Sequence, residues 1–281
     1  MRAFFGHAAH VLALTVATSG LVAGQPTTRG SQPPTRTPPA AAKRIPAPPV
    51  APRREVSVPF RVGETLTYDV SWSQYMVAGS AVSRVVEKRG SPTSSAYYIV
   101  AEGRPLPLIA RIYALYYKMD SLLDSFTALS QRTSLYTEEG SKKRSVSTTF
   151  NRGSKRAQFE MAADPPAKSE FVIPADVQDG LATLYALRAR SLEPGARLTI
   201  PVADEGLLYS VIFDVGAPES VKVPLGSLTA WNLGITILDA AGQPAARNVR
   251  AWISTDARRL PIKLEADLPV GSFILALRTA Q

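Results

Sequence analysis

The chain has 281 residues, of which 45% are hydrophobic and 20% charged, a composition typical of a globular protein with an apolar core. Its formal net charge is +9, but residues 1–55 carry seven basic side chains and one acidic one, which leaves 25 basic and 22 acidic groups beyond them. A groove for nucleic acid would concentrate its basic side chains on the folded part. This distribution therefore argues against nucleic acid as a partner.

The chain contains no cysteine, and both of its histidines, His7 and His10, lie close to the N-terminus. If the N-terminal segment is removed, neither a thiol nor an imidazole remains. That excludes cysteine nucleophiles, histidine-dependent serine hydrolases, and zinc or iron sites built from histidine and cysteine. The sequence patterns of nucleotide-binding loops and serine hydrolases are also absent. We predict no enzyme activity, metal or cofactor, with a carboxylate-based hydrolase as a distant alternative.

Residues 1–24 read as a signal peptide, with Arg2 before a mainly apolar stretch and small residues at the predicted cleavage site. An uncleaved membrane anchor is the alternative. Residues 25–58 contain nine prolines and are predicted to be a disordered, extended Pro-rich linker, either a spacer through the envelope or a leader without a selected length. Residues 59–281 are predicted to form a single β-rich domain. The expected location is the periplasm, or outside the cell.

Alternating apolar residues predict a first strand over residues 66–72, with Leu66, Tyr68, Val70 and Trp72 on one face. Residues 81–86, 97–101 and 115–126 are predicted as further strands, with a short helix over 106–114. A hairpin over 142–161, turning at 151–153, is the clearest signal. It carries a basic cluster: Lys142, Lys143, Arg144, Lys155 and Arg156.

A longer helix is predicted over residues 176–190, with Asp176 as its N-cap, Asp179 in its first turn and Arg188 in its last turn. The strands expected after it cover residues 197–202, 207–215, 220–223, 227–238, 248–254, 260–266 and 272–277. About a dozen strands with two helices indicate an α+β fold that is mainly antiparallel β. We expect a curled sheet or half-open barrel wrapped around one main helix, with a concave face that is either filled or an apolar cavity.

Arg188 falls on the apolar stripe of the predicted helix. It could extend to solvent along its stem, pair inside the core with Asp214 or Asp256, or hold a ligand's carboxylate or phosphate. The candidate ligand-binding residues are Arg188, Tyr185, Tyr113, Tyr116 and Arg259. Tyr113 and Tyr116 lie in a dense apolar segment that is either core or a mobile lid.

The segment 252–261 is predicted to be a hairpin in which Asp256 caps the turn and Pro261 begins the return strand. A binding role for Arg258 or Arg259 is the alternative. The basic cluster could contact a membrane surface through anionic headgroups, or a charged cell-wall polymer. The simpler interpretation is a solvated edge that discourages aggregation.

Three stretches together resemble an uncharacterised exported-protein family known as domain of unknown function 3108: Pro59–Tyr68, Val177–Arg188 and Trp252–Pro261. The resemblance covers nearly all of residues 59–281 and implies location and architecture, not mechanism. A looser, fold-level likeness is to periplasmic lipoprotein carriers, which wrap a curved sheet around helices and shield an acyl chain.

These observations lead to one functional expectation and one rival. The first is a non-catalytic cell-envelope protein that binds a lipid or another amphipathic envelope molecule in the concave face of its sheet. The rival is an envelope assembly or scaffolding factor that binds a partner protein or the cell wall.

Overall fold

The computed structural model describes residues 54–281, apart from residues 73–75, 92–93, 113, 163–164 and 269–270. The predicted signal peptide and almost all of the predicted linker lie outside the described residues. The described part contains two helices, α1 (Pro107–Ala110) and α2 (Gly180–Arg188), and is otherwise dominated by strands. The N-terminal strands are β1 (Thr65–Trp72), β2 (Met76–Ser91), β3 (Ser94–Pro105), β4 (Leu115–Asp124), β5 (Ser130–Glu139), β6 (Lys142–Asn151), β7 (Arg156–Ala162) and β8 (Ala167–Val172). The C-terminal strands are β9 (Arg197–Asp204), β10 (Leu207–Val223), β11 (Gly226–Leu238), β12 (Arg247–Ser254), β13 (Pro261–Leu268) and β14 (Gly271–Ala280).

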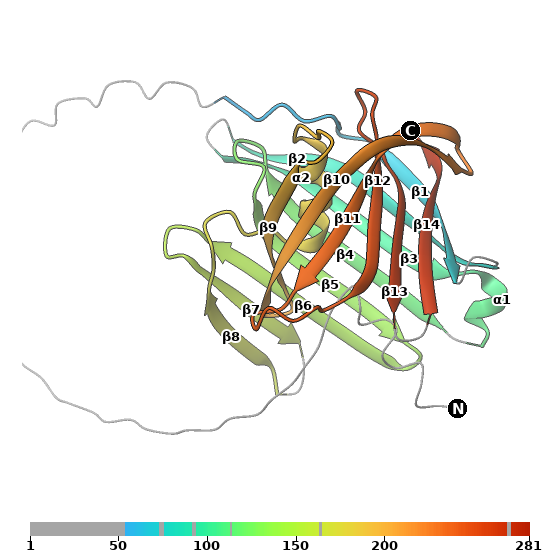
Figure 1. Ribbon diagram of the computed structural model, residues 1–281. Helices are drawn as coiled ribbons and strands as arrows, with labels where there is room; N and C mark the ends of the chain where they lie inside the picture. Colours follow the sequence, from blue (N-terminus) through green and yellow to red (C-terminus); the bar gives the residue numbers. More distant parts are fainter. Residues whose placement is uncertain (1–53, 73–75, 92–93, 113, 163–164, 269–270) are drawn as a thin grey trace, which may run out of the picture.

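All 14 described strands belong to one antiparallel sheet in the order β8-β7-β6-β5-β4-β3-β2-β1-β14-β13-β12-β11-β10-β9. Neighbours in the sheet are neighbours in sequence, except where β1 pairs with β14 in the middle. The strands β8 and β9 end the order and do not pair with each other, so the sheet is unclosed (Figure 1). We call the line along which these two edges face each other the seam.

Helix α2 packs against β3, β4 and β9, and Figure 1 shows it between β9 in front and β4 behind. Seven of its nine residues are buried. The side of the sheet that faces α2 is identified by register, because directly paired residues on neighbouring strands point to the same side. One such inner row crosses seven strands: Leu66, Ser83, Ala101, Met119, Leu135, Val146 and Met161.

The two ends of the sheet are named after what they carry: the motif end after the sequence motifs found there, and the α1 end after helix α1. The motif end carries Glu64 and the turn 254–260. The opposite, α1 end carries α1, the turn 140–141 between β5 and β6, and the turn 204–207 between β9 and β10. A backbone hydrogen bond from Gly140 N to Ala114 O and an ion pair between Arg144 and Glu205 hold these α1-end turns together.

The predicted N-cap at Asp176 is wrong. Asp179 is the N-cap of α2, and its carboxylate accepts a hydrogen bond from Ala182 N at 2.8 Å. The chain cannot be helical before this point, because Gln178 forms a parallel β-bridge with Val202. Asp176 lies exposed in the turn that precedes this bridge.

Several strand predictions also need correction. The strands β5 and β8 were not predicted at all, and the predicted strands 207–215 and 220–223 form one strand, β10, with a register shift between Val215 and Pro218. The predicted helix over 106–114 is one short turn, α1. Apolar periodicity did not reveal β5 and β8 because neither strand alternates apolar with polar residues: Leu135 and Tyr136 are adjacent in β5, and the first four residues of β8 are exposed.

The basic cluster of the predicted hairpin is divided between the two ends of the sheet. Lys142, Lys143 and Arg144 begin β6 at the α1 end, whereas Lys155 and Arg156 stand at the far end of β6 and β7. The seven residues of β6 that follow Arg144 separate the two groups by roughly 23 Å. The five residues therefore do not form one patch.

Candidate functional site

The side chain of Arg188 is fully buried at the motif end, where it forms an ion pair with Glu64. Its two terminal nitrogens donate to the two Glu64 carboxylate oxygens at 2.6 and 2.9 Å. Nε donates to Arg259 O at 2.9 Å and Nη2 also to Arg258 O at 3.0 Å. The guanidinium is therefore satisfied by the protein itself.

The predicted partners of Arg188, Asp214 and Asp256, are both wrong. Asp214 pairs with Arg197 on the sheet surface, with Nε to Oδ1 at 2.7 Å. Asp256 accepts a hydrogen bond from Ser254 Oγ at 2.6 Å. The partner, Glu64, belongs to the first of the three resemblance motifs.

Aromatic rings enclose this ion pair. The Arg188 guanidinium carbon lies 5.4 Å from the ring centre of Phe60 and 5.1 Å from that of Tyr185, within the range of cation–π attraction. The Tyr185 hydroxyl shares a 2.7 Å hydrogen bond with Ser83 Oγ, and burial raises the pKa of Tyr185 to about 12. The Tyr68 hydroxyl donates to Pro261 O at 2.9 Å. All three motifs thus meet around Arg188.

The turn 254–260 is shaped to present its carbonyls to Arg188. Ser254 Oγ accepts from Leu260 N at 2.7 Å, and Arg259 adopts a left-handed conformation with φ of 47°. The Arg259 guanidinium donates to Arg190 O at 3.2 Å. Because these contacts join the end of α2 to the turn and to Glu64, the cluster fixes the C-terminal end of the helix.

The other end of α2 is fixed by a second buried network. The Asp179 carboxylate accepts from Ser121 Oγ at 2.6 Å, while Asp179 N donates to Ser130 Oγ at 2.8 Å. Gln178 Oε1 accepts from Ser130 N and Ser130 Oγ, both at 2.8 Å. Burial raises the pKa of Asp179, and the hydrogen bonds to its carboxylate oppose that rise. The helix is therefore anchored at both termini.

Toward the α1 end, one inner row of the sheet contains several small residues. Register places these residues in one inner row: Leu277, Tyr68, Ala81, Gly103, Tyr117, Thr137 and Arg144. Ala81 and Gly103 supply little or no side chain to this row. A Cβ at Gly103 would meet only Ser80 O, at 4.0 Å. A Cβ at Gly103, which pairs with Tyr117, would therefore make no close contact.

Tyr117 brings an isolated polar atom into this region. Its hydroxyl is buried, and within the described part of the chain no group hydrogen-bonds it. Burial raises the pKa of Tyr117 well above its usual value, and the negative charges of Asp204 and Glu205 raise it further. The phenol therefore stays neutral and remains able to donate or accept.

An ion pair crosses the seam beside Tyr117. Arg144 Nη1 donates to Glu205 Oε1 at 2.6 Å, and the side chain of Glu205 is only 1% exposed. Burial, and then the neighbouring charge of Glu205, raise the pKa of Asp204 to about 7. At this edge the Tyr117 hydroxyl, the Arg144 cation and the carboxyl groups of Asp204 and Glu205 lie beside apolar side chains. A mainly apolar site with a few polar groups at one edge can accept an amphipathic molecule with a polar head.

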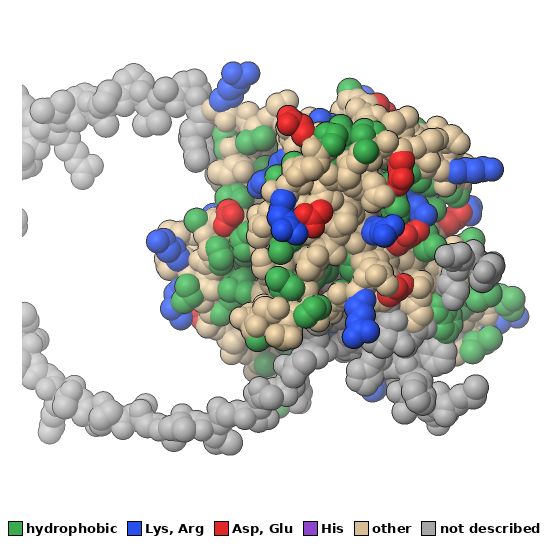
Figure 2. Space-filling view, viewed as in Figure 1, with side chains coloured by type: hydrophobic (Ala, Val, Ile, Leu, Met, Phe, Trp, Pro, Cys, Tyr) green, Lys and Arg blue, Asp and Glu red, His purple; other side chains and the backbone are tan. Residues whose placement is uncertain are grey.

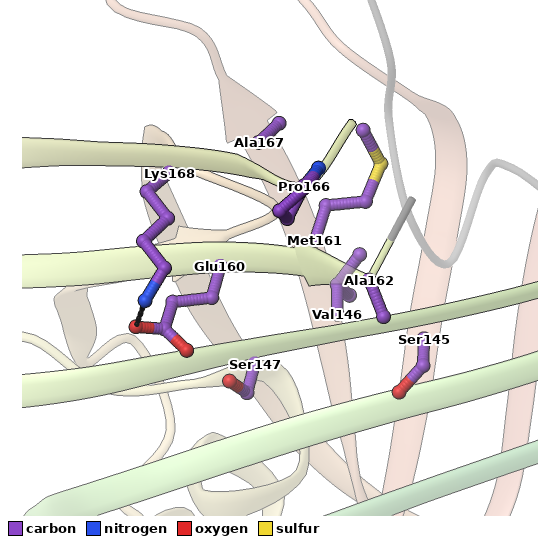
Figure 3. Close-up of a pocket in the computed structure, with 9 residues that line it drawn as sticks. All are labelled: Ser145, Val146, Ser147, Glu160, Met161, Ala162, Pro166, Ala167 and Lys168. Carbon is purple, nitrogen blue, oxygen red and sulfur yellow. Dashed lines mark hydrogen bonds and ion pairs between the residues drawn. The ribbon is translucent and has the colours of Figure 1, made fainter. Parts of the chain in front are cut away.

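A hollow of about 270 Å³ lies on β6, β7 and the start of β8 (Figure 3). Val146 and Met161 contribute apolar groups, and Glu160 and Lys168 form an ion pair at 2.9 Å on one side of it. Its volume falls below that of ordinary ligand pockets. We therefore regard the inner face near Tyr117 as the stronger candidate site.

The structure does not bring the five predicted ligand-binding residues together. Arg188 and Tyr185 are enclosed in the motif-end core, and Arg259 belongs to the turn beside them. Tyr116 lies on the outer face, where its hydroxyl donates to Glu102 Oε1 at 2.8 Å. Tyr113 lies outside the described residues.

Three important residues were missed as site candidates: Glu64, Tyr117 and Glu205. Glu64 stood in a quoted motif, and Tyr117 stood in a correctly predicted alternation with Leu115 and Met119. Their partners could not be found from the sequence alone, because Glu64 and Arg188 are 124 residues apart. No local pattern identifies a contact at that separation.

Among the described residues, no group of three or more acidic, histidine or cysteine side chains is arranged to hold a metal ion. Nor does any described helix have the length and apolar character needed to cross a membrane.

The fold and site define a class of protein: an unclosed antiparallel sheet whose inner face receives a short, doubly anchored helix. The sequence profile of a family described as "Protein of unknown function (DUF3108)" matches residues 67–278, so the chain belongs to that family. No curated protein matches it significantly.

Solved structures with a similar arrangement are distant in sequence. One is a beta-barrel-like DUF1849 protein from Brucella abortus, with 11% identity over 78% of this chain and 97% of that chain, and a TM-score of 0.48. A protein described as exported, with a YmcC-like fold, from Bacteroides fragilis has 10% identity over 81% of this chain and 100% of that chain, with a TM-score of 0.34. A protein described as a lipoprotein, from Parabacteroides distasonis, has 7% identity over 81% and 100%, with a TM-score of 0.33.

Proposed function

We propose that this chain is a non-catalytic cell-envelope protein that binds a lipid or similar amphipathic molecule against the inner face of its sheet at the α1 end. The envelope location rests on the predicted signal peptide and Pro-rich linker. The lack of catalysis rests on the missing imidazole and thiol. In this proposal the unclosed sheet acts as a half-open barrel wrapped around α2, and the ligand occupies the part that α2 leaves uncovered.

Partly exposed apolar side chains support this position. A second inner row changes from buried to half-exposed along its length. It consists of Leu233, Ala251, Leu264, Leu275 and Val70. Leu233 and Ala251 belong to the core, whereas Leu264, Leu275 and Val70 keep solvent contact. An acyl chain laid along these side chains would remove apolar surface from water, at about 25 cal/mol per Å².

The single observation that carries the proposal is the buried Tyr117 hydroxyl. A buried hydroxyl without a hydrogen bond costs about 1–3 kcal/mol, so such groups are uncommon in native proteins. An acceptor on a ligand's head or ester group would recover that cost. Arg144 and Glu205 lie at the same edge and would orient the head.

Native mass spectrometry tests the proposal. The chain, purified from cells after export, is compared with Gly103→Leu, which fills the space beside Tyr117, and with Lys118→Leu, which adds a side chain of the same kind on the outer face of β4. We expect lipid masses on the wild type and on Lys118→Leu, and none on Gly103→Leu, with all three equally stable to urea. Delipidated wild-type protein that takes up nothing from an envelope extract would refute it.

A second candidate function, that of an assembly factor, is favoured by the edge strand β8. Four of its six residues from Ala167 onward are exposed in succession, and its outer edge pairs with no described strand. Such an edge can accept a strand from a partner. A photocrosslinker at Ser169 that captures one envelope protein in cells, in the absence of lipid adducts, would favour this function over the first.

A further inference from the structure

We propose that the α1 end is a docking surface for an anionic membrane, through an apolar projection formed by α1 and the start of β2. Leu108 is 72% exposed, Ile112 is 89% exposed and Met76 is 51% exposed, and Leu106 and Val77 add further exposed apolar surface. Such large values are unusual for aliphatic side chains gathered in one place. This inference concerns contact with the membrane, and it stands whether or not the inner face binds a ligand.

A backbone contact brings the two parts of this projection together. Leu106 N donates to Ala78 O at 2.9 Å, which places α1 beside the first residues of β2. The helix is too short to bury a face of its own, and none of its residues is buried. Figure 2 shows hydrophobic side chains at the lower right, where α1 lies in Figure 1.

Basic side chains flank the projection. Arg104 and Arg111 are exposed on either side of α1. Lys142 and Lys143 follow the turn that contacts Ala114 through Gly140 N, so they belong to the same end of the sheet. Glu138 and Glu139 on β5 offset part of this charge, and Glu138 pairs with Lys143 at 3.4 Å.

An apolar tip with a basic rim is the arrangement that anionic lipid surfaces attract. The aliphatic side chains enter the boundary between headgroups and acyl chains, while lysine and arginine remain among the phosphates. A protein partner would require a wider and flatter patch than a single projecting turn provides. The inner row that contains Tyr117 lies near this same end, so docking would bring it close to the lipid.

Vesicle flotation provides the test, with the chain purified after export. Vesicles of phosphatidylethanolamine and phosphatidylglycerol are compared with vesicles of phosphatidylcholine. The double variant Leu108→Ser/Ile112→Ser should bind the anionic vesicles roughly tenfold less tightly or worse, because it removes two aliphatic side chains that would enter the membrane. Arg111→Gln should weaken binding to the anionic vesicles by about fivefold and hardly affect phosphatidylcholine.

The matched control is Val62→Ser/Val172→Ser. It also removes two exposed aliphatic side chains, 47% and 63% exposed, but from the motif end. Its vesicle binding should equal that of the wild type. The proposal is overturned if the wild type does not float, if both double variants lose binding equally, or if the α1 variant instead abolishes dimerisation of the free protein.

Gly103→Leu separates this inference from the proposed function. It should float as the wild type does, although it is expected to carry no lipid. A loss of flotation in Gly103→Leu would mean that the bound lipid, and not α1, holds the protein on the vesicle.

Discussion

The two ends of the sheet solve the problem of a buried polar group in opposite ways. At the motif end, Arg188 is enclosed by a carboxylate, two carbonyls and two aromatic rings. At the α1 end, the Tyr117 hydroxyl is buried without a hydrogen bond among the described residues. A folding core tolerates few such groups, whereas a binding site needs them.

In the proposed function, inner-facing side chains at the motif end hold the fold together, whereas those at the α1 end contact the ligand. The three resemblance motifs converge at the motif end, which indicates that they define how α2 is attached to the sheet. Residues that contact a ligand would then lie outside the motifs.

The largest expected effect is at the buried ion pair. Glu64→Gln should lower the free energy of unfolding by about 3–5 kcal/mol, because it leaves the Arg188 charge buried and uncompensated. Urea denaturation followed by circular dichroism measures this. Asp214→Asn is the control, since it breaks the surface pair with Arg197 and should have little effect. Similar results for the two variants would contradict the assigned role of Glu64.

The next effect concerns the start of α2. Asp179→Ala should cost about 2 kcal/mol, because it removes the N-cap and leaves Ser121 without its acceptor. Asp176→Ala should leave the urea midpoint unchanged. A larger loss for Asp176→Ala would restore the N-cap first expected from the sequence.

A comparison of tyrosines tests the contrast between the two ends directly. Tyr68→Phe removes a hydrogen bond to Pro261 O and should destabilise the protein by about 1 kcal/mol. Tyr117→Phe removes a hydroxyl that no described group hydrogen-bonds, so the ligand-free protein should be as stable as the wild type or slightly more so. Its affinity for lipid should nevertheless fall, by about tenfold. If Tyr68→Phe and Tyr117→Phe destabilised the protein equally, the two hydroxyls would not differ in the way described.

The smallest expected effect is a pH dependence at the seam. Because the folded-state pKa of Asp204 is raised from 3.8 to about 7, the folded protein holds this proton more tightly than the unfolded chain does. The stabilisation is therefore complete below pH 4 and is lost as the pH rises through 7. Solvent screening of the partly exposed side chain reduces its size. Urea midpoints at pH 5 and pH 8 should differ less in Asp204→Asn than in the wild type, whereas Asp176→Asn should keep the wild-type difference.

Sequence periodicity identified the antiparallel strands wherever one face is buried, as in residues 66–72 and 146–161. It missed β5 and β8, in which apolar and polar residues do not alternate. The candidate site was harder to predict from the sequence, because the burial of its side chains depends on contacts between distant segments. Arg188 was correctly considered as a buried, paired arginine, yet only the fold shows that Glu64 completes the pair. The ligand-binding roles first assigned to Tyr116 and Arg259 have no support from their positions on the outer face and in the turn.

The pairing of β1 with β14 has a consequence for how the protein reaches its native state. Leu66 pairs with Ala280, so the middle of the sheet joins the two extremes of the domain. Contacts at such separation slow folding, since a long loop must close before they form. Two incomplete meanders, β1–β8 and β9–β13, would expose open strand edges until the last ten residues arrive. A chain that crosses a membrane before it folds would need protection from aggregation during that interval, and its final strand would act as the closing step.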